Sequence, residues 1–186
     1  FYAATKKSCE TMSHSYSHLF KIPVTIFRFF TVYGPWGRPD MALFKFTKAI
    51  LNNEPIQIFN HGNMKRDFTY IGDLVNSIIL LINKIPIIND KTYENIDNLS
   101  PVAPFRLINI GNSKCVPLMD FIQCIEKALN KKAIKNFLPM QDGDVTSTWA
   151  NADLLYALTN YQPNTDVETG INFFIDWYKD YYKIKN

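Results

Sequence analysis

The sequence predicts an α/β fold built on a parallel sheet, and two kinds of segment predict it. Residues 22–32 and 107–111 are short, nearly continuous apolar runs, as expected for strands that are buried on both faces. Longer segments around them repeat their apolar residues at helical spacing. Strands that alternate with helices are typical of a parallel sheet covered by helices. We expect residues 22–32 to form a central strand of this sheet.

The other elements follow from local patterns. Residues 2–20 are predicted to form a helix whose narrow apolar stripe suits a seam between two helices better than a broad core face. That stripe consists of Cys9, Met12, Tyr16 and Leu19. Further helices are predicted at residues 41–52, 74–82, 118–129, 153–158 and from 165 onward, and further strands at 56–59 and 133–138. Residues 60–63 should turn the chain back toward Arg66, and residues 84–104 make a long polar surface connection.

Two helix starts carry capping signals. Asp73 is a candidate N-cap for the helix at 74–82, whose apolar residues lie nearly all round, so we expect this helix between two layers. Residues 165–168 (TDVE) have the spacing of a capping box at the start of the last helix.

Composition excludes several classes of function. The chain has 186 residues, 47% of them hydrophobic, which is enough to bury a core. Its net charge of +3 is small, and basic residues are mixed with acidic ones, which argues against a nucleic-acid partner. No apolar run approaches the roughly 20 residues that span a membrane. Cys9, Cys115 and Cys124 are widely spaced, which suits reduced thiols in a cytoplasmic protein.

Tyr2 and Lys6 are candidate catalytic residues. Positions i and i+4 share one face of a helix, and a fixed ammonium stabilises a phenolate, which can take a proton from an alcohol. Glu10, His14 and His18 also share a helix face with zinc-like spacing. No third strong ligand lies nearby, so we expect surface histidines instead.

Ligands of parallel sheets bind beyond the carboxyl ends of the strands, so residues 31–40 are expected near the chemistry. Prolines and glycines constrain this loop, and Arg38 is its group best suited to an anion, with a surface salt bridge as the alternative.

Three stretches extend the Tyr2–Lys6 pattern: residues 28–40 (RFFTVYGPWGRPD), 66–71 (RDFTYI) and 109–112 (NIGN). With them, residues 1 to about 182 resemble the extended short-chain dehydrogenase/reductase enzymes that act on nucleotide sugars, most closely the UDP-glucuronate 4-epimerases. The resemblance implies the C-terminal part of an NAD(P)-binding Rossmann-like fold plus a smaller α/β substrate-binding domain. In the family, a glycine-rich loop and a Ser/Thr partner precede the catalytic tyrosine, so we expect a C-terminal piece of a longer protein.

The resemblance also implies a division of the chain. Residues 1–33 would end the dinucleotide-binding domain and residues 34–186 would form mainly the substrate domain, with about 69–83 and 105–112 returning to the Rossmann-like sheet. The implied NAD contacts are Tyr2, Lys6, Phe30 and Val32. The implied substrate contacts are Thr31, Arg38, Lys45, Phe59, Arg66, Gln141 and Asp144. Gln141 stands where relatives often carry an arginine, so it would offer the diphosphate a neutral donor, and no metal is implied.

The resemblance further implies the reaction. Tyr2 would remove the proton of the sugar 4-hydroxyl while NAD takes the hydride from C4, which gives a 4-keto sugar. This intermediate would turn in the pocket before the hydride and the proton are returned, so that UDP-glucuronate and UDP-galacturonate interconvert. A homodimer through the helix at 2–20 is implied as well, and the chain alone is expected to be inactive. Alternatives are a UDP-glucose 4-epimerase, a UDP-glucuronate decarboxylase, a sugar 4,6-dehydratase, a non-catalytic nucleotide-sugar-binding or dimerising fragment, and a purely structural α/β domain.

Overall fold

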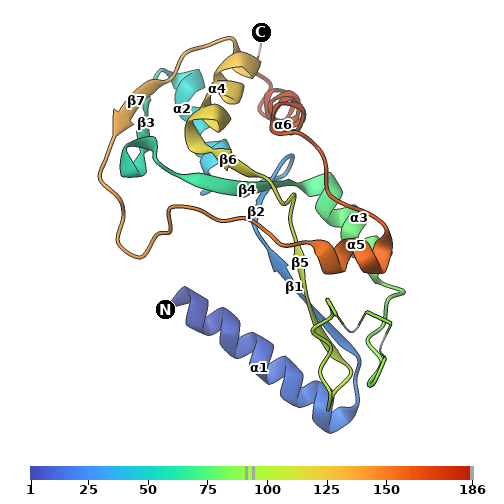
Figure 1. Ribbon diagram of the computed structural model, residues 1–186. Coiled ribbons are helices and arrows are strands. Elements are labelled where there is room, and N and C mark those ends of the chain that lie inside the picture. The colour runs from blue at the N-terminus through green and yellow to red at the C-terminus, as the bar shows by residue number, and fades with distance from the viewer. Residues whose placement is uncertain (91, 94, 185–186) are drawn as a thin grey trace.

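The protein is described here from a computed structural model that covers residues 1–90, 92–93 and 95–184. Figure 1 shows two regions: the long helix α1 (Tyr2–Phe20) beside the ladder of β1 (Val24–Phe29) and β5 (Phe105–Ile110), and a layered region of helices and short strands beyond it. α3 (Ile71–Leu81) and α5 (Asp153–Thr159) lie near the junction.

Parallel pairing dominates, which confirms the α/β prediction. β1 pairs with β5 in parallel from Val24↔Phe105 to Phe29↔Ile110. β2 (Thr31–Tyr33) pairs in parallel with β4 (Lys65–Tyr70), and β3 (Pro55–Ile58) pairs in parallel with β7 (Ile134–Phe137). The one antiparallel pair in the described part of the chain joins β4 to β6 (Cys115–Pro117).

The single central strand predicted at 22–32 is wrong. The chain bends at Phe30, whose carbonyl accepts a bond from Val32 N at 3.1 Å, so β1 and β2 turn toward different partners, β5 and β4. Among the described residues β1 pairs with β5 alone, and Arg28 and Phe29 are exposed. The apolar run therefore predicted strands but did not predict the bend between them.

The predicted helices form, and two apolar cores hold them. The larger core joins α2 (Ala42–Asn52), α4 (Leu118–Leu129) and α6 (Val167–Tyr181) to β3 and β4. In it the rings of Phe68 and Phe121 stack with centroids 3.9 Å apart. The smaller core joins α3 and α5 to β5 through residues such as Leu74, Ile108 and Leu155.

Both capping predictions need correction. α3 begins at Ile71, so Asp73 lies inside its first turn, and its carboxylate accepts bonds from the loop before α6 instead. α6 is capped by Asp166, which accepts from Thr169 N at 2.9 Å, one residue later than the predicted spacing. In each case a carboxylate found a backbone donor that the linear pattern did not single out.

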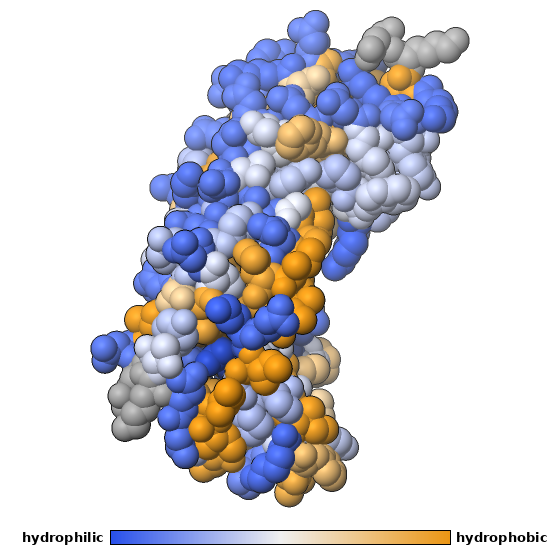
Figure 2. Space-filling model, turned by 90° about the vertical axis from the view of Figure 1, so that its right-hand side faces the viewer, coloured by the Kyte–Doolittle hydropathy of each residue, from blue (hydrophilic) through white to orange (hydrophobic). Residues whose placement is uncertain are grey.

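α3 is not enclosed between two layers of this chain. Val75 and Ile79 are 46% and 56% exposed. Figure 2 views the side that carries α3 and α5 and shows apolar side chains gathered on its lower half; the exposed ones of α3 and the following segment include Ile82, Ile85 and Ile87.

The turn at residues 60–63 and the connection at 84–104 also differ in detail. β3 runs into a short 3-10 helix η1 (Phe59–Gly62), and β3 and β4 are not partners. The described part of the connection is anchored: Arg106 and Asp97 form a buried ion pair at 2.7 Å. The Asn98 carboxamide bonds both the N–H and the carbonyl of Leu107, which covers the outer edge of β5.

Candidate active site

Tyr2 and Lys6 share one face of α1, as predicted. Lys6 Nζ lies 5.4 Å from the centroid of the Tyr2 ring. Both residues line a cleft of about 800 Å³ between α1 and β1, together with residues 26–30 and Asn109. A nearby ammonium favours the negative charge that a proton acceptor needs.

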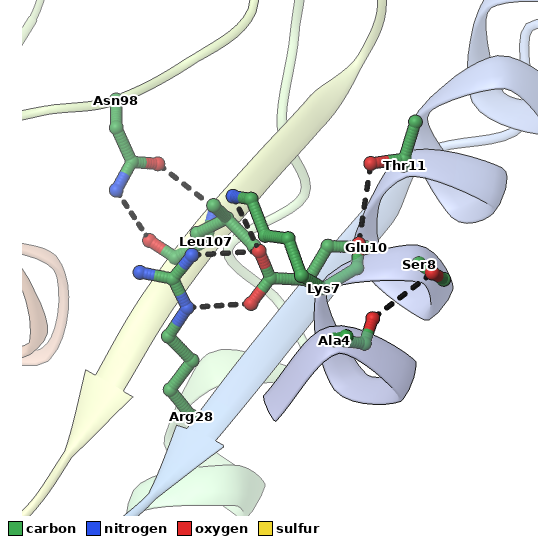
Figure 3. Close-up of polar contacts among 8 residues, drawn as sticks. All are labelled: Ala4, Lys7, Ser8, Glu10, Thr11, Arg28, Asn98 and Leu107. Carbon is green, nitrogen blue, oxygen red and sulfur yellow. Dashed lines mark hydrogen bonds and ion pairs between the residues drawn. The ribbon is translucent and has the colours of Figure 1, made fainter. Parts of the chain in front are cut away.

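An ion-pair network fixes this helix on β1 (Figure 3). Arg28 donates from Nε and Nη2 to the two oxygens of Glu10 at 2.6 and 2.7 Å, and Lys7 Nζ lies 2.9 Å from Glu10 Oε2. The bond from Arg28 outweighs desolvation and lowers the pKa of Glu10 to about 2, while the same bond raises the pKa of Arg28. A bidentate pair constrains orientation as well as distance, so it fixes how α1 presents Tyr2 and Lys6.

Sequence reasoning missed this pair. From the sequence, Arg28 only interrupts an apolar strand and Glu10 is only a zinc candidate. A charge inside an apolar strand needs a partner, and that is the signal that could have found it.

The two histidines contact the segment before β5. His14 Nε2 lies 2.9 Å from Ser100 Oγ and His18 Nδ1 lies 2.7 Å from the Val102 carbonyl oxygen. In the described part of the chain no group of three side chains is arranged to hold a metal ion. His14 is partly buried, so only His18 matches the expected surface histidine.

The loop after β2 brings a second set of predicted residues together. Thr31, Val32 and Arg38 line one small hollow. Arg38 donates to both oxygens of Asp40, from Nε at 3.0 Å, and both side chains are largely exposed. This pairing raises the pKa of Arg38, with a smaller contribution from Tyr2, and lowers the pKa of Asp40, with a smaller contribution from Lys45. Arg38 is therefore held in a surface ion pair with Asp40.

A third set lies on β4 and the loop after β7. Arg66 Nη2 donates to Asp144 Oδ1 at 2.8 Å, across 78 residues of sequence, and Nη1 donates to the Lys65 carbonyl. Gln141 is exposed in the same loop, and Phe59 is half-buried at the start of η1. The residues of this set do not line the cleft of Tyr2 and Lys6.

The fold and this site define a class of protein: α/β enzymes in which a helical Tyr-x-x-x-Lys pair faces the cleft beside a parallel strand. The comparisons give the family. Residues 1–94 match the NAD dependent epimerase/dehydratase family. The chain is 54% identical over 184 residues to a probable UDP-glucuronate 4-epimerase of Rhizobium meliloti and 53% identical over 184 residues to the protein CapI of Staphylococcus aureus. Each match includes 98% of this chain. The chain belongs to this family.

Solved structures agree on the fold. The UDP-glucuronic acid 4-epimerase of Bacillus cereus, in complex with UDP-glucuronic acid and NAD, superposes with a TM-score of 0.82 at 34% identity over 97% of this chain and 53% of that one. A UDP-glucose 4-epimerase of Thermotoga maritima at 19% identity shares the fold, with a TM-score of 0.80 over 97% of this chain and 54% of that one. The chain spans about half the length of the curated relatives it matches, 54% of the Rhizobium protein and 55% of the Staphylococcus protein.

Proposed function

We propose that this chain provides the catalytic helix and the nucleotide-sugar-binding part of an NAD-dependent UDP-glucuronate 4-epimerase, which interconverts UDP-glucuronate and UDP-galacturonate. The observation that carries the proposal is the cleft in which Tyr2 and Lys6 face the apolar wall of β1. The similarity to proteins named as UDP-glucuronate 4-epimerases supports this choice of reaction over the alternatives. The two-part division at residue 33 is proposed with it.

Tyr2 performs the proton chemistry. It takes the proton of the sugar 4-hydroxyl and returns it after the configuration at C4 has changed, and Lys6 holds the charge of the phenolate between these steps. Arg28 and Glu10 keep the helix that carries both residues against β1.

NAD, when bound, accepts and returns the hydride of C4. The residues present fit its reacting end, since Tyr2, Lys6 and Phe30 line one cleft and would hold it. Val32, the fourth predicted contact, lines the hollow after β2 instead. The seven glycines of the chain nowhere form a Gly-x-x-Gly-x-x-Gly cradle for a pyrophosphate. The described cleft therefore accounts for the chemistry of the cofactor and not for its full binding.

Arg66 and Asp144 form the nucleotide end of the site. A guanidinium has five N–H donors, and the two bonds to Asp144 and Lys65 leave others for a diphosphate. Asp144 would meet the ribose hydroxyls, Phe59 the uracil ring, and Gln141 and Lys45 the phosphates. Thr31 and Arg38 would meet the sugar carboxylate, for which Arg38 must share or leave Asp40.

A hybrid enzyme tests the reaction. In it this chain replaces the segment that it matches in the Rhizobium meliloti relative, and UDP-glucuronate with NAD is the substrate. We expect UDP-galacturonate as the product. A pentose product would indicate a decarboxylase, and a 6-deoxy product would indicate a dehydratase. A preference for UDP-glucose would indicate a UDP-glucose 4-epimerase. Binding of UDP without turnover would indicate a non-catalytic binding fragment.

We also propose a homodimer through α1. Its inward face is polar and buries Ser17, whereas Met12, Tyr16 and Leu19 are 57%, 63% and 69% exposed on the outer face. An apolar stripe that its own sheet leaves uncovered fits a second copy of the helix. Leu19→Lys should shift the chain from dimer to monomer in sedimentation equilibrium; the exposed substitution Lys48→Glu on α2 is the control and should not.

A cytoplasmic location is part of the same proposal. Cys9, Cys115 and Cys124 are free thiols, as suits a reducing compartment. No helix in the described ranges is long and apolar enough to cross a membrane.

A further inference from the structure

We propose that Asp67 is a positioning residue that holds the loop of Gln141 and Asp144 against Arg66 and thereby shapes the nucleotide-binding edge. The proposal rests on the proposed function only in naming a UDP-sugar as the ligand. Asp67 is neither a predicted contact residue nor part of the cleft around Tyr2.

The Asp67 carboxylate is fully buried and fully bonded. Its relative exposure is 0%. Oδ1 accepts from Asn112 N at 2.9 Å and from Thr69 Oγ1 at 3.1 Å, and Oδ2 accepts from Ser113 N and Ala150 N, both at 2.9 Å. A buried carboxylate is costly unless donors surround it, so these four bonds hold three chain segments at one point.

One of those segments is the strap of residues 146–150, which runs beside β4. Lys65 N donates to the Thr146 carbonyl at 2.9 Å, Thr148 N donates to the Lys65 carbonyl at 3.3 Å, and Ala150 N reaches Asp67. Asp144 lies just before this strap, and its carboxylate meets Arg66 at 2.8 Å. The position of the strap along β4 therefore decides whether Asp144 lies beside Arg66.

The second segment is the turn after β5, which links this edge to Phe30. A Cβ on Gly111 would lie 2.4 Å from Ala150 Cβ, 3.1 Å from Asp67 Oδ2 and 3.2 Å from Phe30 Cδ2. Only glycine allows this approach, so the stretches 66–71 and 109–112 meet at Asp67. Phe30, a proposed cofactor contact, packs against the same junction.

Asp67→Asn tests the inference because it keeps shape and removes acceptors. In the place of Oδ2 the NH2 group faces two backbone donors, Ser113 N and Ala150 N, and in the place of Oδ1 it faces Asn112 N and the Thr69 hydroxyl, which can turn to accept. At least one backbone N–H loses its acceptor in either orientation. Asp73→Asn is the matched control: Asp73 is buried to 8% exposure and accepts from Tyr161 Oη, Asn164 N and Thr165 N, none of them in the 138–150 segment.

The experiment titrates the 186-residue chain with UDP by calorimetry, with the folded fraction of each variant matched by circular dichroism, and follows amide exchange. We expect Asp67→Asn to raise the Kd for UDP about tenfold or more and to speed amide exchange in residues 141–150. Asp73→Asn should lose comparable stability and keep the wild-type Kd.

Three results would overturn the inference: the same UDP affinity in Asp67→Asn as in wild type, an equal loss of affinity in both variants, or no UDP binding by the wild-type chain. If Asp67→Asn does not fold, the wild-type chain decides: rapid exchange of the Ser113 and Ala150 amides would overturn the inference, and protection that increases with UDP would support it. Turnover is not measured, so an inactive hybrid enzyme would overturn the proposed function alone.

Discussion

The region around Tyr2 and the region around Phe121 are held together by different forces. α1 meets β1 and the segment before β5 through polar contacts of Glu10 with Arg28 and of His14 with Ser100. α4 and α6 meet β4 through fully buried apolar side chains such as Phe121, whose ring stacks on Phe68. Directional bonds fix the orientation of a catalytic helix, whereas apolar packing supplies stability without specifying direction. The comparison predicts that mutations near Tyr2 change chemistry and mutations near Phe121 change folding.

Tyr2→Phe should give the largest effect on chemistry. Because only a hydroxyl is lost, turnover of the hybrid enzyme should fall by roughly 10² to 10⁴ while its melting temperature stays the same. Lys6→Met should also lose activity because the phenolate loses its charge partner. Initial rates with UDP-glucuronate measure both, and wild-type rates in both variants would remove the catalytic assignment.

Phe121→Ala should give the largest effect on folding. The ring is fully buried and stacked on Phe68, so its loss should cost about 3–5 kcal/mol in urea unfolding of the chain. Phe29→Ala is the control in the other region: Phe29 is 49% exposed and should cost less than half as much. Equal costs would show that the two regions do not differ in the way proposed.

Arg38→Ala should separate substrates. If Arg38 meets the sugar carboxylate, kcat/KM for UDP-glucuronate in the hybrid should fall roughly ten- to a hundredfold, and residual activity on UDP-glucose should hardly change. Asp40→Asn, which frees Arg38 from its ion pair, should not reduce activity on UDP-glucuronate. An equal loss on both substrates would instead place Arg38 at the shared diphosphate or in loop stability.

Acid should weaken the polar contact between α1 and β1, with a smaller effect than the substitutions above. The pKa of Glu10 is lowered from 4.5 to about 2, so its bond with Arg28 stabilises the fold above about pH 4.5 and is lost as the pH falls toward 2. Arg28 is 44% exposed, so solvent screening limits the gain to about 1 kcal/mol. Urea midpoints at about pH 5 and about pH 3 should differ less in Glu10→Gln than in wild type. An identical pH dependence in both would contradict the assignment.

Periodicity and residue type determined much of this protein. The helix at 2–20, the shared face of Tyr2 and Lys6, and the other helices follow from spacing along the chain, because a helix repeats within a few residues. The stretches quoted for the family resemblance were likewise sufficient for the family. The roles of the proposed cofactor and substrate contacts remain predictions.

Tertiary structure decided what each polar group bonds. The three backbone N–H groups that bond Asp67 lie 45, 46 and 83 residues away, and Arg66 meets Asp144 across 78 residues. The bend at Phe30 and the polar inner face of α1 were also settled by partners brought in from elsewhere in the chain, whereas the cap at Asp166 is a local bond from Thr169 N, one residue later than the predicted spacing. Local sequence reports the period and the chemistry of a side chain, but packing of distant segments selects among its possible partners, because a buried charge must be matched wherever a donor lies.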